Sequence, residues 1–189
     1  MTEEGGTSPG EGFRGPGDVI VRAPMPGDRD GILAVVRDAF TSDDRDASEE
    51  VDIVLSTWER RPEPSRLELV AVADDAIVGH VLAAAGSLGG RDVVAIAPLA
   101  VSPSWQGTRI GTSLMRRLLD RAEAETLPLV VLLGLPAYYR RFGFEPSGPL
   151  GICYRAVGEG NPHFLARRFA GYTPSYRGDF TYCWEMVPG

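Results

Sequence analysis

Val-Ser-Pro-Ser-Trp-Gln-Gly-Thr-Arg-Ile-Gly-Thr, residues 101–112, is the stretch of sequence that decides the fold. The residues before it, Ala95–Val101, are apolar and strand-like, and Pro103 ends that strand. From Arg109 onward apolar residues recur with helical spacing, and charged residues occupy the other face. The apolar positions are Ile110, Leu114, Met115, Leu118, Leu119 and Ala122. A strand, a glycine-containing loop and a helix N-terminus form a site for an anion such as phosphate, because free backbone N–H groups and the helix dipole point at it.

Two familiar phosphate-binding loops are excluded. The chain contains no lysine, so the G-x-x-x-x-G-K-[ST] loop of nucleotide-triphosphate-binding proteins is absent. No G-x-G-x-x-G follows a predicted strand, so a dinucleotide-binding fold has no support.

A second informative stretch lies downstream and reads Gly134-Leu135-Pro136-Ala137-Tyr138-Tyr139-Arg140-Arg141-Phe142-Gly143-Phe144. It follows Leu129–Leu133, a continuous apolar run that is typical of a buried strand.

The two stretches together resemble the signatures of the GNAT superfamily of N-acetyltransferases. Gln106-Gly107-Thr108-Arg109-Ile110-Gly111 is similar to the family's pyrophosphate loop, [QR]-x-x-G-x-[GA], except that Arg109 replaces the middle glycine. In the second stretch, Tyr139 falls on the family's tyrosine and Gly143-Phe144 on its Gly-Phe pair. The resemblance extends from Asp18 to the C-terminus and is closest to small bacterial members with a G-x-P-x-Y-Y-x-x-F-G-F motif.

The resemblance implies an α/β fold, namely a single GNAT-like domain with a mixed, mostly antiparallel central sheet flanked by helices. It also implies that acetyl-CoA is the co-substrate and that an acetyl group passes to an amine of a small molecule or protein by direct attack in a ternary complex. The loop would hold the pyrophosphate and the preceding strand the pantetheine. The implied cofactor-binding residues are Leu99, Ala100, Val101, Gln106, Gly107, Thr108, Arg109, Ile110, Gly111 and Thr112.

Tyr139 is the catalytic residue that the resemblance implies, with its hydroxyl protonating the leaving thiolate. Its simpler interpretation is a core aromatic side chain. Tyr138 lies about 100° further back around the helix and is expected to pack elsewhere. An acceptor amine has a pKa of about 10.4 and needs a base, yet Val94–Pro98 carries no carboxylate. The candidates for this base, which the sequence does not separate, are Glu68, His80, Tyr154 and Glu145.

Arg109 is the main departure from the family pattern. We expect arginine to occupy the first helical turn without strain and its guanidinium to reach a CoA phosphate, partly replacing the close backbone approach that glycine allows. The departure leaves open an alternative function, a non-catalytic acyl-CoA-binding or regulatory domain of the same fold.

The acidic run Asp43–Asp52 has two interpretations. It could attract a cationic amine, but it better suits the solvated start of a helix, where carboxylates are favoured.

Periodicity predicts the remaining elements in the order β-α-α-β-β-β-α-β-α-β. Strands are expected at Asp18–Ala23, Leu67–Ala73, Ile77–Ala85, Val93–Val101, Leu129–Leu133 and Phe180–Val187, and the first two helices begin near Asp28 and Asp46. Gly148–Arg177 has mixed character. The predicted domain is residues 18–189, and residues 1–17, rich in glycine, are expected to form a disordered tail.

Composition narrows the class of protein further. A net charge of −7 argues against nucleic acid as a partner, and the longest apolar run, Leu127–Leu133, is too short to span a membrane. Cys153 and Cys183 match no metal-binding spacing, and no export signal is visible, so we expect a cytoplasmic protein without a metal. A homodimer is expected only by analogy with the family.

Overall fold

The computed structural model describes residues 19–42, 44, 46–60, 67–183 and 185, so the expected tail at residues 1–17 lies outside the described residues. The helices are α1 (Arg29–Phe40), α2 (Ser48–Arg60), α3 (Ile110–Ala124) and α4 (Pro136–Tyr139). The strands are β1 (Ile20–Arg22), β2 (Leu67–Ala73), β3 (Ala76–Leu88), β4 (Arg91–Val101), β5 (Leu129–Leu133), β6 (Glu145–Pro146), β7 (Ile152–Cys153), β8 (Phe164–Arg168) and β9 (Gly178–Tyr182).

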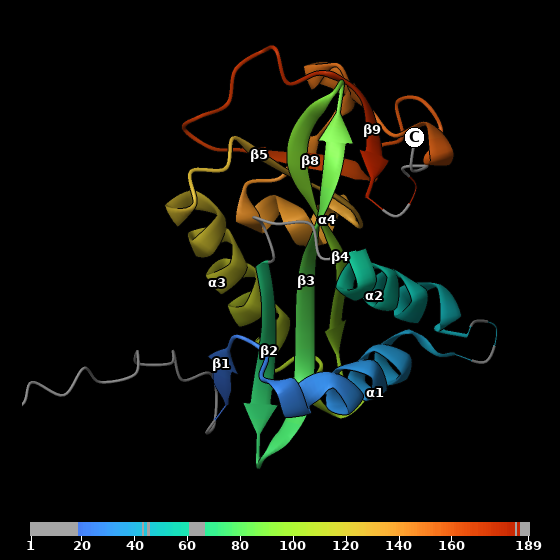
Figure 1. The fold of residues 1–189 in the computed structure, drawn as a ribbon, viewed down its shortest axis with the longest axis vertical. Coiled ribbons are helices and arrows are strands. Elements are labelled where there is room, and N and C mark those ends of the chain that lie inside the picture. Colours follow the sequence, from blue (N-terminus) through green and yellow to red (C-terminus); the bar gives the residue numbers. More distant parts are fainter. Residues whose placement is uncertain (1–18, 43, 45, 61–66, 184, 186–189) are drawn as a thin grey trace, which may run out of the picture.

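Seven of these strands form a mixed sheet in the order β1-β2-β3-β4-β5-β8-β6, and along this order the β4–β5 pair alone is parallel (Figure 1). Off this path, β9 pairs antiparallel with β3 and parallel with β7. The hairpin between β2 and β3 turns at Asp74 and Asp75, as the sequence predicts, and both residues adopt the positive φ angles that a tight two-residue turn requires. The predicted fold class, a single α/β domain with a mostly antiparallel sheet, is confirmed.

The two faces of the sheet are covered by different elements (Figure 1). The first face packs against α3, whose core-facing apolar side chains, from Ile110 to Ala122, are at most 2% exposed. A Cβ atom on Gly79 of β3 would come within 2.9 Å of the Ile110 side chain, so glycine lets the start of α3 approach the sheet closely. The other face packs against α1 and α2 near β2 and β3.

The C-terminal segment covers the rest of this second face. In Gly148–Arg177, whose structure the sequence pattern did not predict, the chain forms β7 and β8. The last described strand is Gly178–Tyr182, and part of the expected strand Phe180–Val187 lies outside the described residues. Within them the chain turns after Tyr182, where Glu185 donates its N–H to the Tyr182 carbonyl. This strand extends β3 to Leu88 by pairing with its end, and Phe180, Tyr182 and Phe164 form an aromatic cluster there. None of the helices in the described ranges is long and apolar enough to cross a membrane.

Leu118 tests the packing of α3, because its side chain is fully buried against the sheet. We expect Leu118→Ala to lower the free energy of unfolding by about 2–5 kcal/mol, through lost apolar burial and the cavity that remains. Chemical denaturation measures the change. The matched control is Met25→Ala, at a side chain that is 56% exposed, and it should change stability by less than about 0.5 kcal/mol.

Candidate functional site

The site begins where β4 and β5 part. They pair only over Val94–Ile96 and Val130–Leu132, although β4 continues to Val101. The cause lies in β4, where an extra residue shifts the register against β3, so that Val81 faces Leu99 but Ala83 faces Ile96. Among the described strands, none pairs with this side of β4 beyond Ile96, so no neighbouring strand uses its backbone groups there.

A cavity of about 410 Å³ lies between the end of β4 and the N-terminus of α3. It is lined by all of the sequence-predicted cofactor-binding residues except Ala100 and Thr108. Ala100 is buried under α1 and α2 on the other face of the sheet, and the Thr108 hydroxyl donates to the Trp105 carbonyl at 2.5 Å. The predicted residues that the cavity brings together are Leu99, Val101, Gln106, Gly107, Arg109, Ile110, Gly111 and Thr112.

The loop before α3 lines the cavity and leads directly into the N-terminus of that helix. The Gln106 side-chain amide donates to the Val101 carbonyl at 3.1 Å, which ties the loop to the end of β4. The bond from the Ser113 N–H to the Arg109 carbonyl is the first of the α-helical ladder. The N–H groups of Ile110, Gly111 and Thr112 precede that bond and have no partner within the helix, as at every helix N-terminus. These are the N–H groups that the sequence analysis predicts to bind an anion.

The expectation for the backbone of Arg109 is wrong. Arg109 precedes α3 as its N-cap and has a φ of 71°, in the left-handed region, rather than occupying the first turn without strain. An L-residue with a Cβ atom pays about 1–2 kcal/mol for this conformation. The glycine of the family pattern therefore serves the turn itself as well as close approach to a phosphate, and this chain keeps the turn with a strained arginine.

Four further residues line the cavity that the sequence motifs did not indicate. Ala39 and Phe40 come from the end of α1, Trp105 from the loop, and Arg141 from the segment after α4. A hydrogen bond from the Ser102 hydroxyl to Asp38, at 2.7 Å, holds the end of α1 beside the end of β4. No local signal could have placed α1 here, because its position depends on a contact between residues 64 positions apart.

Tyr138, which the sequence analysis expected to pack elsewhere, also lines the cavity. Its hydroxyl lies where a Cβ on Gly111 would come within 2.9 Å, so glycine leaves room for the phenol over the helix N-terminus. Burial raises the pKa of Tyr138, while a hydrogen bond with Thr112 and the charge of Arg141 partly offset that increase. The phenol therefore stays protonated at neutral pH and can donate to an anion in the cavity.

Tyr139 is not among the residues that line this cavity. Its ring lies edge-on to Tyr138, with centroids 4.9 Å apart, and packs against Phe144. A Cβ on Gly134 would come within 2.3 Å of the Tyr139 ring, so this ring covers the backbone just beyond the end of β5. Burial is the main cause that raises the pKa of Tyr139, with a smaller effect of Tyr138, and a protonated phenol is what a proton donor requires.

Three of the four candidate bases form hydrogen bonds that occupy them elsewhere. A Glu68 carboxylate oxygen accepts from Trp58 Nε1 and lies 2.9 Å from His80 Nε2, all beneath α2. Glu145 pairs with Arg168 on the surface.

Tyr154, the fourth candidate, donates its hydroxyl to Glu185 at 2.6 Å. Its ring packs on the aromatic cluster of the second sheet face.

A second cavity of about 440 Å³ adjoins the first, and Arg141 lines both. Its charged lining is mostly basic, with one carboxylate and four guanidinium groups: Asp120, Arg116, Arg141, Arg167 and Arg168. The charge balance suits another anionic group that is attached to the occupant of the first cavity.

Comparisons with known proteins agree with this geometry. The sequence model of the Acetyltransferase (GNAT) family matches residues 31–144, and the chain therefore belongs to the GNAT family of acetyltransferases. It is 34% identical over 130 residues to the uncharacterized N-acetyltransferase YhbS of Escherichia coli strain K12, an alignment that covers 67% of this chain and 74% of YhbS. It is also 34% identical over 103 residues to YjhQ of the same strain, covering 52% of this chain and 57% of YjhQ.

Two solved structures resemble the whole fold. The crystal structure of YhbS from Escherichia coli in complex with CoA superposes with a TM-score of 0.75 and 29% identity, covering 94% of this chain and 93% of that one. A GNAT family acetyltransferase from Brucella melitensis in complex with acetyl-CoA gives a TM-score of 0.70 and 27% identity, covering 87% and 95%.

The strain at Arg109 predicts an unusual order of stabilities. Glycine relieves the left-handed conformation and alanine does not, so we expect Arg109→Gly to be more stable than Arg109→Ala by about 1 kcal/mol. At Arg116, an exposed position inside α3, the order should reverse, because glycine costs about 1 kcal/mol relative to alanine in a helix. Denaturant unfolding of the four variants measures both differences, and the same order at both positions would contradict the strain.

Proposed function

We propose that this acetyltransferase uses acetyl-CoA as its co-substrate and passes the acetyl group directly to an amine of a small molecule or protein in a ternary complex. The observation that carries the proposal is the continuity between the anion cavity at the start of α3 and the parted strands β4 and β5. A pyrophosphate and an extended amide-containing arm, joined as they are in CoA, match these two features in order.

Binding is assigned to the loop and the end of β4. The N–H groups at the start of α3 would hold the pyrophosphate, with the Tyr138 hydroxyl and the Arg109 guanidinium nearby in the cavity lining. Leu99, Ala100 and Val101 would offer backbone groups to the pantetheine, as a neighbouring strand does. The arginines of the second cavity suit the remaining phosphate of CoA.

Catalysis is assigned to the place where the strands part. A backbone N–H of β4 would polarise the thioester carbonyl, since a fixed donor stabilises the negative charge that develops on that oxygen. Tyr139, whose ring covers the backbone beyond β5, would protonate the departing thiolate. Its buried phenol keeps its proton at neutral pH until the sulfur needs it.

The alternative of a non-catalytic acyl-CoA-binding domain is not favoured by the family membership. We also propose a cytoplasmic location, which rests on the sequence, and a homodimeric state, which rests on analogy with the family. Neither affects the assignment of the site.

Release of free CoA in the presence of a panel of amines, measured above background hydrolysis, tests the proposed function. Turnover that depends on an amine supports acetyl transfer. Binding of acetyl-CoA without turnover on any amine would favour the alternative.

Arg109→Ala tests whether the guanidinium contacts a CoA phosphate. We expect weaker CoA binding, and a larger loss at low ionic strength, where charge interactions are less screened. Titration of CoA at several salt concentrations measures the effect. An affinity that matches the parent protein at every salt concentration would mean that the side chain points into solvent.

Tyr139→Phe tests the proton donor, because it removes the hydroxyl and keeps the ring that packs on Phe144. We expect turnover to fall by about 10²-fold, near the lower end for general acid catalysis, with little change in acetyl-CoA binding. Tyr138→Phe should instead weaken acetyl-CoA binding and spare turnover, since Tyr138 lines the anion cavity. Equal and small effects of the two substitutions would show that Tyr139 is not the acid.

A further inference from the structure

The acceptor side of the reaction can be located from the face of the sheet on which each aromatic side chain lies. Tyr139 packs with the cluster on the α3 face, together with Val94 and Ile96 of β4. Ala97 of β4, the first residue past the last β4–β5 pair, packs instead with the aromatic cluster of the opposite face, and so does Tyr154. The two tyrosines therefore stand on opposite sides of the sheet at the point where β4 and β5 part.

Strand pairing places Tyr154 close to that point. Its ring lies 5.4 Å from the ring of Phe164, centroid to centroid. Phe164 pairs across β8 and β5 with Leu133, which follows the last β5 residue that is joined to β4. The ring also contacts Phe180 and Tyr182, so its position is set by three aromatic neighbours.

The hydroxyl of Tyr154 is oriented by Glu185. It donates to Glu185 Oε1 at 2.6 Å, while Glu185 Oε2 accepts the N–H of Tyr182 at 2.9 Å and is thereby fixed in place. Because the phenol proton is committed to the carboxylate, the oxygen presents its lone pair to other donors. On this partly buried side chain, a phenol oxygen with this orientation is an acceptor for an N–H group.

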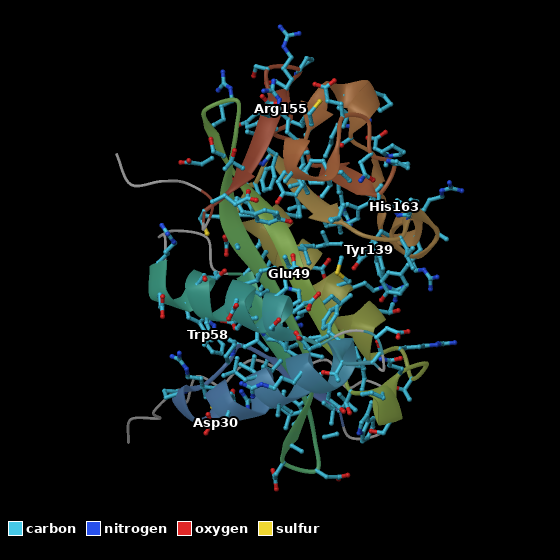
Figure 2. All side chains as sticks on the ribbon, turned by 90° about the vertical axis from the view of Figure 1, so that its right-hand side faces the viewer. Asp30, Glu49, Trp58, Tyr139, Arg155 and His163 are labelled. Carbon is cyan, nitrogen blue, oxygen red and sulfur yellow. The ribbon has the colours of Figure 1, made fainter. Side chains whose placement is uncertain are left out.

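A second carboxylate acts on the same phenol from a different part of the chain. Burial is the main cause that raises the pKa of Tyr154, followed by its hydrogen bond with Glu185, the charge of Glu185, Tyr182 and the charge of Glu49. Glu49 lies in the first turn of α2, at the opposite end of that helix from Trp58 (Figure 2). The phenol thus stays neutral and lies in the field of two carboxylates from α2 and the C-terminal segment.

We propose that Tyr154 is the catalytic residue that accepts a proton from the acceptor amine, that Glu185 positions it and receives its proton in turn, and that Glu49 helps to attract an alkylammonium acceptor to this face. The inference rests on the proposed acetyl transfer and names its substrate class, a primary amine that is protonated in solution. The structure describes all four candidate bases. Of these, Tyr154 is the one that combines a free lone pair with a position beside the parted strands β4 and β5.

The proton balance is as follows. One N–H proton of the ammonium moves to the Tyr154 oxygen as the phenol proton moves to Glu185, which leaves a neutral amine and a protonated carboxyl group. The amine nitrogen then bonds to the thioester carbon, the C–S bond breaks, and the nitrogen loses a second proton while the sulfur gains one. Glu185 finally releases its proton to water, so one proton leaves per acetyl group transferred.

Kinetics with two amines tests the proton transfer. The full-length protein and Tyr154→Phe are assayed with phenethylamine, which is protonated near neutral pH, and with aniline, which is neutral there. We expect the variant to lose about 10- to 100-fold in kcat/KM for phenethylamine at pH 7, and the difference to narrow as pH rises toward the pKa of the amine, about 10. With aniline the loss should stay within about threefold, and acetyl-CoA affinity should not change.

Two further variants separate chemistry from packing. Glu185→Gln should reproduce the pH dependence of Tyr154→Phe, whereas Tyr172→Phe, at the edge of the same aromatic cluster, should match the parent protein. Equal losses for both amines at every pH would reduce Tyr154 to a packing residue and overturn the proposal.

A binding measurement keeps the inference distinct from the proposed function. Phenethylammonium is titrated calorimetrically into the CoA complex of the parent protein, Glu49→Gln and Glu185→Gln. Binding that weakens severalfold in both variants supports the acceptor site, even if no amine is acetylated and the proposed function fails. Equal affinity in all three proteins, or no binding to the parent protein, overturns the site.

Discussion

The parting of β4 from β5 is the constraint on which the rest of the structure depends. Backbone N–H and C=O groups that leave water need partners, and β4 loses its strand partner on one side after Ile96. The extra residue of β4 opposite Val81–Ala83 creates the opening, and the end of α1 and the loop before α3 enclose it. The chain thus builds a sheet with one position left for a ligand in place of a strand. The same helix whose apolar side closes the core on one face would present its N-terminus to the phosphate end of the proposed ligand.

In the proposed mechanism, the sheet also separates the two proton transfers that acetylation of an amine requires. Tyr139 lies on the α3 face and Tyr154 on the other, so a thioester between the parted strands would be reached from both sides. Burial raises the pKa of both phenols, which suits one as a donor and the other as a relay to Glu185. A single type of side chain can serve two roles because the neighbouring groups differ. Tyr139 is surrounded by aromatic rings, whereas Tyr154 has a carboxylate as its hydrogen-bond acceptor.

The sequence predicts the core of this arrangement well, because the main strands and α3 have strong periodic patterns. Leu67–Ala73, Leu129–Leu133 and the buried side of α3 agree with the structure, and most of the predicted cofactor-binding residues line one cavity. The predictions fail where long-range contacts decide the outcome. Phe40 reaches the cavity only because Ser102 holds the end of α1, and β8 is recognisable only through its pairing with β5. The prediction for the backbone of Arg109 was wrong for a different reason. A loop can impose a left-handed φ angle that no side-chain pattern reveals.

A sheet that reserves one position for a ligand links the integrity of the protein to the supply of that ligand. A molecule that binds only the folded chain stabilises it by about 2.7 kcal/mol at a concentration 100 times its Kd. In a cell, a gain of this size lowers the unfolded fraction about a hundredfold and slows proteolysis that proceeds through global unfolding. The open side of β4 would therefore make the abundance of this enzyme follow the acetyl-CoA concentration. A fall in acetyl-CoA would then lower both the amount of the enzyme and its rate of turnover.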